Sequence, residues 1–509
     1  MTAASRRSPL PPLRRGVRLW RTTDLVKADR PTLGIFAVAF AISVYARFVL
    51  APDRSLWLDE AWTLGIAGLP DWGTTLQQVW LDANAPLYPL LIHGWAQLAG
   101  TSDTALRVPS LLFSLATPLL VAGWRGDGLR VDDRLAVATL LTVWPEGLLQ
   151  AGEARGYALL LVLATAQTLV FLDLIRRPER ARAAVFVGLA GLVVLTHYQA
   201  AVLGIAQGLV LLATHRGRAV RLWPAALLAL PVLAVGLWHA PRLAQFARPD
   251  VAWYPPVTWA TVGAALLYLT HSGWLCILSV AGLLRAAGRL GQGQAVAAGP
   301  PWPWLAVLAT GLAAVVMLSI GALRPSFSLR YLTPFAPGTA LLLVLGARAL
   351  VPGFSGAVTG LMLMATVLSA QWTSEVAGRL SHPYSFQAAS RDLMATHPAR
   401  LVFLWDHPAQ RVEQPSQYVM FGGAFLHRAG STATVIPVMV GPDEDPNPRL
   451  VQSARKPDSV ILWLYDTNVR GTAATRFPPR ISDLDPAFGC RNYAKGRIGV
   501  IACARGWRP

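Results

Sequence analysis

The chain has 509 residues, of which 54% are hydrophobic and 14% are charged. Its mean hydropathy of +0.43 is too high for a soluble enzyme of several domains and excludes a purely cytosolic protein. A formal net charge of +18 would suit a nucleic-acid-binding protein, but the basic residues form short clusters between long apolar runs. That distribution is typical of a polytopic membrane protein, so we expect membrane lipids, and no nucleic acid, among its partners.

Basic residues, nearly all of them arginine, dominate residues 1–31, and we interpret this segment as a retained cytoplasmic tail. The preference for arginine over lysine, with abundant Ala, Gly and Pro, suggests a bacterial sequence. Eleven apolar stretches of spanning length follow and predict an α-helical transmembrane domain over residues 32–372. These stretches are 32–50, 106–124, 134–151, 157–175, 183–197, 198–214, 222–240, 271–286, 302–322, 331–349 and 354–372.

The stretch 86–99 is shorter and contains His93 and Gln97, so we expect it to form a helix at the membrane surface and not a span. If it stays outside, the basic loops fall on the same side as the N-terminus, as the positive-inside rule requires. We therefore expect a protein of the cytoplasmic (inner) membrane with a first outer loop at 51–105. The basic loops are Arg125–Arg134, Arg176–Arg182, His215–Arg221 and Arg285–Arg289.

Residues 373–509 differ from the rest, with more charged residues, Pro-rich turns and short apolar runs. We expect a small extracytoplasmic α/β domain, with a helix at 385–396 and strands at 401–405, 435–440, 460–465 and 498–502. In an oxidising compartment Cys490 and Cys503 could form a disulfide, which would close a loop of about a dozen residues and stabilise the domain by roughly 3 kcal/mol. Two free thiols are the alternative, since spacing alone does not show how far apart the two residues lie.

An acidic pair, Asp59 and Glu60, opens the first outer loop and is set among tryptophans. In a purely structural interpretation the tryptophans anchor the chain at headgroup depth and the carboxylates face water. A carboxylate in a partly apolar site, however, has its proton affinity raised and can accept a proton from a hydroxyl. The pair is therefore a candidate catalytic base.

Three further polar clusters fall in outward loops under the same topology. Singly, each has a structural interpretation, because a Glu–Arg pair can simply end a helix. Together with the acidic pair, they bring carboxylates, aromatic rings and arginines, which bind phosphate bidentately, to one face. We therefore predict a site for a sugar and a lipid-linked phosphate at the membrane surface. The three clusters are Glu153, Arg155 and Tyr157; His197 and Tyr198; and Arg330 and Tyr331.

An ordered set of motifs over residues 33–350 resembles the GT-C membrane glycosyltransferases. The most similar branch is that of the protein O-mannosyltransferases and the bacterial lipid A aminoarabinose transferase, glycosyltransferase family 39. The chain departs from this family at Asn84-Ala85-Pro86, where His-Pro-Pro is common. The motifs are Leu-Trp-Leu-Asp59-Glu60-Ala, Asn84-Ala-Pro-Leu-Tyr88 followed by His93, Leu106-Arg107-Val-Pro-Ser110, Glu153-Ala-Arg155-Gly-Tyr157 and Arg330-Tyr331-Leu-Thr-Pro334.

The resemblance implies a GT-C fold and transfer of a sugar from a polyprenyl-phosphate-linked monosaccharide to a lipid, glycan or protein acceptor on the outer face. Asp59 matches the family's catalytic aspartate and Glu60 its neighbour. Arg155 or Arg330 would stabilise the departing phosphate. The remaining donor-binding candidates are Glu153, Tyr157, His197, Tyr198 and Tyr331, and those for the acceptor or for loop support are Tyr88, His93 and Arg107.

We expect no obligatory cofactor, because arginines can neutralise the phosphate. A divalent metal, Mg²⁺ or Mn²⁺, held by Asp59, Glu60 and Glu153 is the alternative. A transporter or flippase of lipid-linked sugars is a competing function, although its ionisable residues would be expected near the midplane and not at the ends of spans. A third interpretation, a structural membrane component with a soluble interaction domain, depends on residues 373–509.

Overall fold

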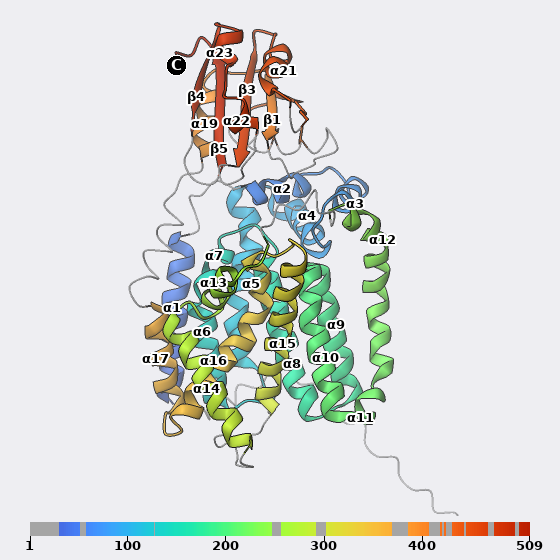
Figure 1. Cartoon of the computed structure of the whole chain (residues 1–509), viewed down its shortest axis with the longest axis vertical. Coiled ribbons are helices and arrows are strands. Elements are labelled where there is room, and N and C mark those ends of the chain that lie inside the picture. The colour runs from blue at the N-terminus through green and yellow to red at the C-terminus, as the bar shows by residue number, and fades with distance from the viewer. Residues whose placement is uncertain are drawn as a thin grey trace, which may run out of the picture.

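The computed structural model describes residues 30–50, 58–126, 128–246, 256–291, 302–368, 385–406, 418–419, 422–423, 430–441, 444–466, 473–493 and 498–508. A bundle of helices forms the larger part of the molecule, and a small α/β domain at the C-terminus covers one end of it (Figure 1). The predicted cytoplasmic tail lies outside the described residues, except for its last two.

The bundle contains the long apolar helices that the sequence predicts. Among the described residues, seven helical stretches are long and apolar enough to cross a membrane, or eight if one bent pair counts as a span. The chain is therefore a multi-pass membrane protein, although the predicted number of eleven is not confirmed. The seven stretches are Arg30–Phe48, Asp103–Gly123, Tyr157–Arg176, Tyr198–His215, Trp223–Gln245, Trp302–Leu323 and Leu329–Leu350.

Several predicted spans are broken or short. The stretch 134–151 is two helices that meet at Pro145, because proline lacks the N–H that would continue the first helix. The bent pair, α13 and α14, turns by 89° at its break. The helices of the bundle are α1 (Arg30–Leu50), α5 (Asp103–Gly123), α6 (Val131–Val143), α7 (Pro145–Ala151), α8 (Tyr157–Arg176), α9 (Arg180–Thr196), η2 (Tyr198–Ala200), α10 (Ala201–His215), α11 (Gly217–Val220), η3 (Trp223–Ala229), α12 (Leu230–Phe246), α13 (Trp259–Thr270), α14 (Gly273–Gly291), α15 (Trp302–Leu323), η4 (Leu329–Phe335), α16 (Ala336–Leu350) and α17 (Gly356–Leu368).

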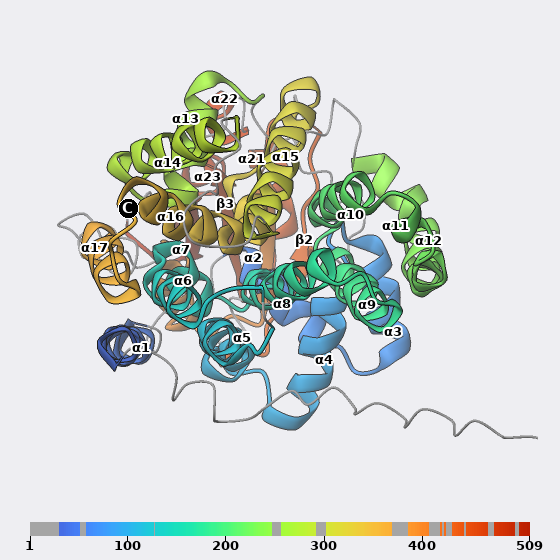
Figure 2. The ribbon, with the colours of Figure 1, turned by 90° about the horizontal axis from the view of Figure 1, so that it is seen from below.

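The bundle is organised around α8 and α16. Seen along the bundle, α8 lies near the centre, whereas α1 and α12 lie at the periphery (Figure 2). The apolar span of α8 is 78% buried, whereas the span formed by η3 and α12 is only 6% buried. Most of the surface of η3 and α12 is therefore exposed on the outside of the bundle, where lipid would contact it. Close packing of α14 on α16 requires glycine, because a Cβ on Gly282 would collide with Gly346.

Three short helices lie between the bundle and the C-terminal domain (Figure 1). They are α2 (Leu58–Ala67), α3 (Trp72–Leu81) and α4 (Leu87–Ala99). The prediction of a helix at 86–99 is confirmed by α4, which has 13 residues, too few to cross a bilayer. Asp71 caps α3 by accepting a hydrogen bond from the N–H of Thr74. These helices place residues 58–99, the described part of the predicted first outer loop, at the end of the bundle opposite α11 and its basic neighbours (Figure 1).

The C-terminal domain is a five-stranded mixed sheet in the order β2-β1-β3-β5-β4. The strands β2, β1 and β3 are parallel, and β5 runs antiparallel between β3 and β4. The predicted helix and all four predicted strands are present, whereas β4 was not predicted. The elements are α19 (Ser385–Met394), β1 (Arg400–Asp406), β2 (Thr434–Pro437), α21 (Pro446–Ser453), β3 (Ser459–Asp466), α22 (Ala473–Arg476), α23 (Ile481–Leu484), β4 (Phe488–Asn492) and β5 (Ile498–Arg505).

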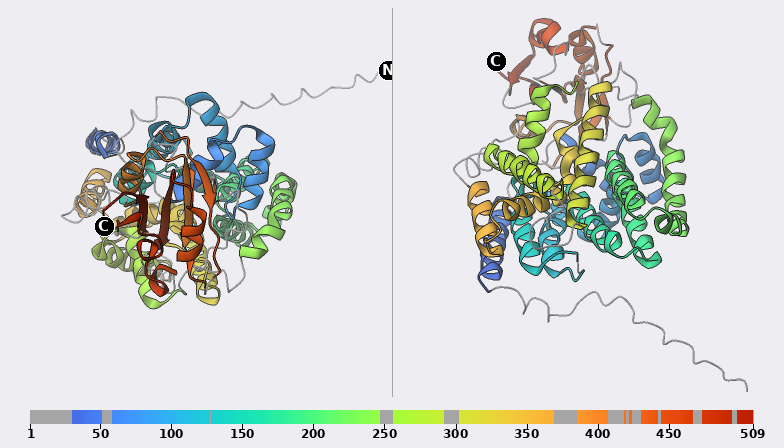
Figure 3. Two further views of the ribbon diagram at one scale, coloured as in Figure 1. Left: turned by 90° about the horizontal axis from the view of Figure 1, so that it is seen from above. Right: turned by 60° about the horizontal axis from the view of Figure 1, so that its bottom comes forward.

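Both faces of this sheet are buried, which explains the nearly continuous apolar runs of β1 and β3. One face forms a cluster with α19 that includes Leu401, Phe403 and Leu464. The opposite face, with Leu404 and Trp463, packs against α21 and α23. Seen from above, the sheet lies over the end of the bundle (Figure 3).

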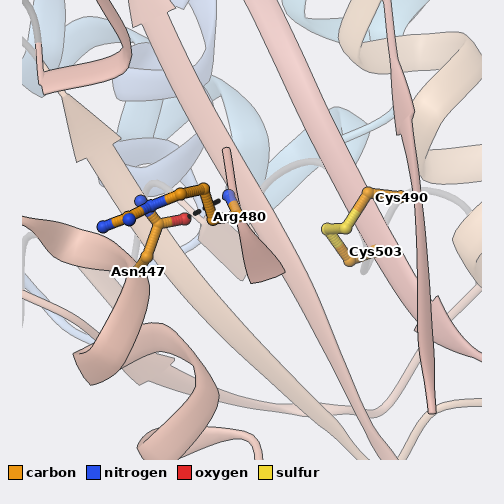
Figure 4. The surroundings of a disulfide bond; sticks show 4 residues. All are labelled: Asn447, Arg480, Cys490 and Cys503. Carbon is orange, nitrogen blue, oxygen red and sulfur yellow. Dashed lines mark hydrogen bonds between the residues drawn. A yellow bond between two sulfur atoms is a disulfide. The ribbon is translucent and has the colours of Figure 1, made fainter. Parts of the chain in front are cut away.

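Cys490 on β4 and Cys503 on β5 are directly opposite each other in the register of the two strands. They form a disulfide, with Cα atoms 4.1 Å apart (Figure 4). Of the two alternatives that the sequence left open, the structure therefore has the disulfide. On the same face of the sheet, the N–H of Arg480 donates to Oδ1 of Asn447 at 2.8 Å, which ties α21 to the segment before α23 (Figure 4).

Candidate active site

Helix α2 places its two acidic residues on different sides. Residues three or four apart share one face of a helix, so Asp59 lies on the side of Trp62, whereas Glu60 lies on the side of Leu64. Trp62 and Thr63 line a pocket, and Leu64 packs against the apolar cluster of α4 and α5. The neighbouring carboxylates therefore point toward different parts of the molecule.

Glu60 forms a buried ion pair with Arg107 of α5. The Nε and Nη2 atoms of Arg107 donate to Oε1 and Oε2 of Glu60 at 2.9 and 2.8 Å. The N–H of Ala154 also donates to Oε1 of Glu60, at 2.6 Å. This carboxylate is 1% exposed, so its bonds hold α2, α5 and the loop after α7 together.

Asp59 lies between two arginines that come from distant parts of the chain. Its Oδ2 atom is 3.4 Å from Nη1 of Arg330 and 3.9 Å from Nη2 of Arg155. Arg155 also donates from Nη1 to the backbone carbonyl of Asp59 at 3.1 Å. Within the described part of the chain, Oδ1 of Asp59 makes no hydrogen bond, and the carboxylate is 36% exposed. That oxygen is therefore available to a substrate.

Arg155 retains an unused donor. Nε of Arg155 is buried and has no hydrogen-bond partner among the described residues. Arg330 lies over the ring of Tyr157, 6.0 Å from its centroid, which orients the guanidinium. A phosphate beside the two guanidinium groups would find two positive charges and, in Nε of Arg155, a donor without a partner among the described residues.

Glu153 lies in the loop between α7 and α8, and its carboxyl group interacts electrostatically with Arg330 and Asp59. Burial raises the pKa of its carboxyl group, Arg330 lowers it in part, and the carboxylates of Glu60 and Asp59 raise it further. No hydrogen bond or ion pair to its carboxylate occurs within the described residues. Glu153 is therefore a second acid close to Asp59 that can hold a proton more readily than an exposed glutamate.

Aromatic residues surround His197, which ends α9. Its ring is 4.5 Å from that of Tyr331 and 5.9 Å from that of Tyr157. Burial lowers the pKa of His197 to about 4, with a further contribution from Arg155. The imidazole is therefore neutral at pH 7 and can both donate and accept a hydrogen bond.

These residues border one pocket beside α2. Arg155 lines this pocket and its Nη2 atom is 3.9 Å from Oδ2 of Asp59, so the carboxylate is next to the pocket lining. Four of the predicted site residues line it directly: Tyr88, Arg155, Tyr157 and His197. The other lining residues are Trp62, Thr63, Ile66, Asp82, Asn84, Ala85, Pro89, Gly156 and Thr196. Aromatic rings with a few polar groups are a typical lining for a small-molecule site.

Among the predicted residues that do not line the pocket, His93, Arg107 and Tyr198 are engaged in other contacts. The ring of His93 packs edge-on against Trp72, 4.6 Å away, and is 1% exposed. Arg107 is engaged with Glu60, which fits the loop-support role that the sequence suggested. Tyr198 points toward α12, where its hydroxyl is 2.7 Å from Nδ1 of His239. His93 and Tyr198 are therefore not part of the pocket lining.

Trp62, Asp82 and His239 were missed by the sequence analysis. Asp82 follows α3 and its carboxylate accepts hydrogen bonds from Asn84, while its backbone carbonyl is 2.8 Å from Nε2 of His239. A carbonyl only accepts, so Nε2 of His239 carries the proton and Nδ1 accepts from Tyr198. Trp62 stood within the acidic motif, where the tryptophans were interpreted either as membrane anchors or as the apolar surroundings of a carboxylate, but it was not named as a site residue. His239 stood inside an apolar run without a neighbouring motif.

The metal alternative fits the site poorly. Among the described residues, no group of three or more His, Cys, Asp or Glu side chains is placed to hold a metal ion. Glu60, one of the three proposed ligands, uses both carboxylate oxygens for Arg107 and Ala154. We therefore derive no chemical step through a metal.

Comparisons with known proteins place this site in a recognised fold. No protein-family model and no curated protein matches the sequence. The structure is similar to ArnT from Cupriavidus metallidurans bound to undecaprenyl phosphate, with 13% identity and a TM-score of 0.52 over 92% of this chain and 98% of that one. The apo state of the same ArnT has 12% identity and a TM-score of 0.54 over the same shares.

An archaeal protein has the same architecture. The oligosaccharyltransferase of Archaeoglobus fulgidus in its apo form is 12% identical, with a TM-score of 0.54 over 91% of this chain and 73% of that chain. Both proteins have the GT-C fold, so the fold that the motifs predicted is confirmed. The chain is a polytopic membrane protein with the GT-C fold.

Proposed function

We propose that this protein is a membrane glycosyltransferase that takes its sugar from a polyprenyl-phosphate-linked monosaccharide. The observation that carries the proposal is the position of Asp59, at the edge of an aromatic pocket and between Arg155 and Arg330. The sugar would occupy the pocket and its phosphate would lie between the arginines. Support also comes from ArnT, a structural neighbour at 13% identity, which was solved with undecaprenyl phosphate bound.

The reaction is a single displacement with inversion at the anomeric carbon. Oδ1 of Asp59 accepts the proton of the acceptor hydroxyl while the hydroxyl oxygen forms a bond to the anomeric carbon. The bond between that carbon and the phosphate oxygen breaks, and its electron pair leaves with the polyprenyl phosphate. Arg155 and Arg330 stabilise the charge that develops on the leaving phosphate, an effect worth about 2.7–4 kcal/mol of barrier for one such donor.

Glu60 and Arg107 have a positioning role in this proposal. Their buried ion pair fixes the first turn of α2, which carries Asp59, and anchors it to the loop of Arg155 through Ala154. Tyr157, His197 and Tyr331 form the aromatic side of the donor site, with Glu153 as a further polar group. The arginines take the role that a divalent metal would otherwise have.

The reaction takes place on the outer face of the cytoplasmic membrane. The supporting pattern is electrostatic, because the basic segment around α11 lies at the opposite end of the bundle from the site (Figure 1). The acceptor is a lipid, glycan or protein hydroxyl that reaches the pocket from that face.

A panel of radiolabelled polyprenyl-phosphate monosaccharides tests the proposal. The purified protein is incubated with each donor and with a membrane extract as the source of acceptor, and the radiolabel that moves from the polyprenyl carrier to another molecule is measured. We expect transfer from one class of donor. If no donor is consumed and the intact donor instead crosses the membrane of proteoliposomes, the protein is a transporter of lipid-linked sugars and the proposal is wrong.

A further inference from the structure

The C-terminal sheet packs directly on the helix that carries Asp59. Ala61 of α2 is 1% exposed and belongs to the same buried cluster as Phe403, Leu462 and Val500 of the sheet. Trp62 packs against this cluster as well. The figures agree with this contact, because α2 lies directly below the strands (Figure 1). The domain is thus in contact with the active-site helix and is not a separate appendage.

The opposite side of α2 packs against the bundle. Leu64 contacts both the sheet cluster and a second cluster that includes Ala67, Ile92 and Leu106. A helix of 10 residues is marginal by itself in water, since its stability depends on packing. The position of α2 is therefore set by the bundle on one side and by the sheet on the other.

Trp62 connects the sheet with the substrate pocket. Its side chain lines the pocket and also packs against the sheet cluster. It lies three residues after Asp59, on the same face of α2. A shift of the sheet would therefore move one wall of the pocket and the carboxylate at its edge together.

We propose that the C-terminal sheet is a positioning element of the active site, which acts through Trp62 and α2 to hold Asp59 in its reactive geometry. This inference rests on the proposed transferase function. A reacting group must be held to about 0.5 Å, and a displacement of about 1 Å can cost a hundredfold in rate. The bundle supplies the arginines for the phosphate, whereas the sheet supplies the second support of the base. Disturbing the sheet face toward α2 should thus lower kcat and leave donor affinity unchanged.

Two leucines one position apart in the register of β1 and β3 provide a matched test. Leu464 of β3 belongs to the cluster that contains Ala61. Leu404 of the neighbouring strand β1 belongs to the cluster on the opposite face, and both side chains are fully buried. The variants Leu464→Val and Leu404→Val remove the same atoms and should lower the melting temperature of the domain to a similar extent. In the full-length protein, kcat and the KM for the polyprenyl-phosphate sugar are measured for each.

We expect Leu464→Val to lower kcat by about tenfold at an unchanged donor KM, and Leu404→Val to keep the wild-type kcat. Equal kcat values for the two variants would overturn the proposal. Trp62→Ala should lower kcat further and Trp62→Phe should restore most of it, because a phenyl ring keeps part of the contact. Full activity of Trp62→Ala would also contradict the role of the contact.

Amide hydrogen exchange separates this inference from the proposed function. Leu464→Val should accelerate exchange in the peptide that contains α2 relative to Leu404→Val, whether or not the donor has been identified. Unchanged exchange in α2 would overturn the positioning role. If exchange in α2 accelerates as expected but the wild-type protein consumes no sugar donor, the contact is real and the proposed function has failed.

Discussion

The two faces of α2 give adjacent carboxylates different surroundings. On the bundle side, Glu60 is 1% exposed and both of its oxygens are bonded to Arg107 or to the N–H of Ala154. On the pocket side, Asp59 is 36% exposed and lies near two arginines at longer distances. A carboxylate whose bonds are all used holds elements together, and one with an available oxygen can accept a proton. This difference supports a structural role for Glu60 and the proposed catalytic role of Asp59.

Removing the charge on the bundle side should have the largest effect on stability. Glu60→Gln leaves the Arg107 guanidinium buried without a counter-charge, and breaking a buried pair costs about 3–5 kcal/mol. Thermal unfolding of the protein in detergent measures this loss. Asp59→Asn is the matched control and should change stability by less than about 1 kcal/mol, as expected for a partly exposed pair. Similar melting temperatures for the two variants would remove the distinction between the faces.

Substitution of an arginine beside the pocket should change the rate of sugar transfer. Arg330→Ala should lower the rate of sugar transfer by about 10²–10³-fold and weaken binding of the polyprenyl-phosphate donor, since one of the two phosphate-binding groups is lost. Arg324→Ala, which removes an exposed arginine shortly before it in the chain, serves as the control and should be neutral. Unchanged donor affinity in Arg330→Ala would rule out the phosphate assignment.

Labelling of the two disulfide cysteines tests on which side of the membrane the C-terminal domain lies. If residues 373–509 are extracytoplasmic, Cys490 and Cys503 should react with a maleimide only after reduction, in a Cys276→Ser background. Their replacement by serine should destabilise the domain by about 3 kcal/mol. Labelling of both residues in freshly isolated membranes without a reductant would contradict the predicted orientation.

The smallest expected effect concerns the response to acid. The pKa of His197 is lowered to about 4, whereas the unfolded chain has a value of about 6.5. Between these values the unfolded state binds a proton that the folded state excludes, so His197 contributes stability above pH 6.5 that is lost as the pH falls toward 4. The melting temperature of His197→Gln should therefore fall less than that of wild type between pH 6.5 and 4.5. Parallel pH profiles would contradict the burial of a neutral imidazole.

Much of the site could be predicted because its residues stand in polar motifs between apolar runs. Asp59, Arg155 and Arg330 are unusual at the ends of spans, and the charge pattern placed their loops on one face. The different surroundings of Asp59 and Glu60 were not predictable from the sequence. They depend on Arg107 and the N–H of Ala154, which bind Glu60 only in the folded chain.

Other features were hidden for physical reasons. Trp62 resembles any tryptophan at a membrane interface, and its contact with the sheet joins residues more than 300 positions apart. The strand β4, Phe488–Asn492, was missed because its last residues are polar and face solvent. Prolines such as Pro145 divide apolar runs into shorter helices. A count of spans from hydropathy alone does not detect these breaks.

A direct comparison of Asp59→Asn with Asp71→Asn tests the assignment of the catalytic base. Asp71 caps α3 in the same outer loop, and asparagine is an equally good cap, so this control keeps the structure and removes one carboxylate. Single-turnover transfer from the preferred polyprenyl-phosphate sugar is measured with saturating protein. We predict that Asp59→Asn lowers the rate by about 10²–10⁴-fold with donor still bound, while Asp71→Asn matches wild type. Transfer at the wild-type rate by Asp59→Asn would show that Asp59 is not the base.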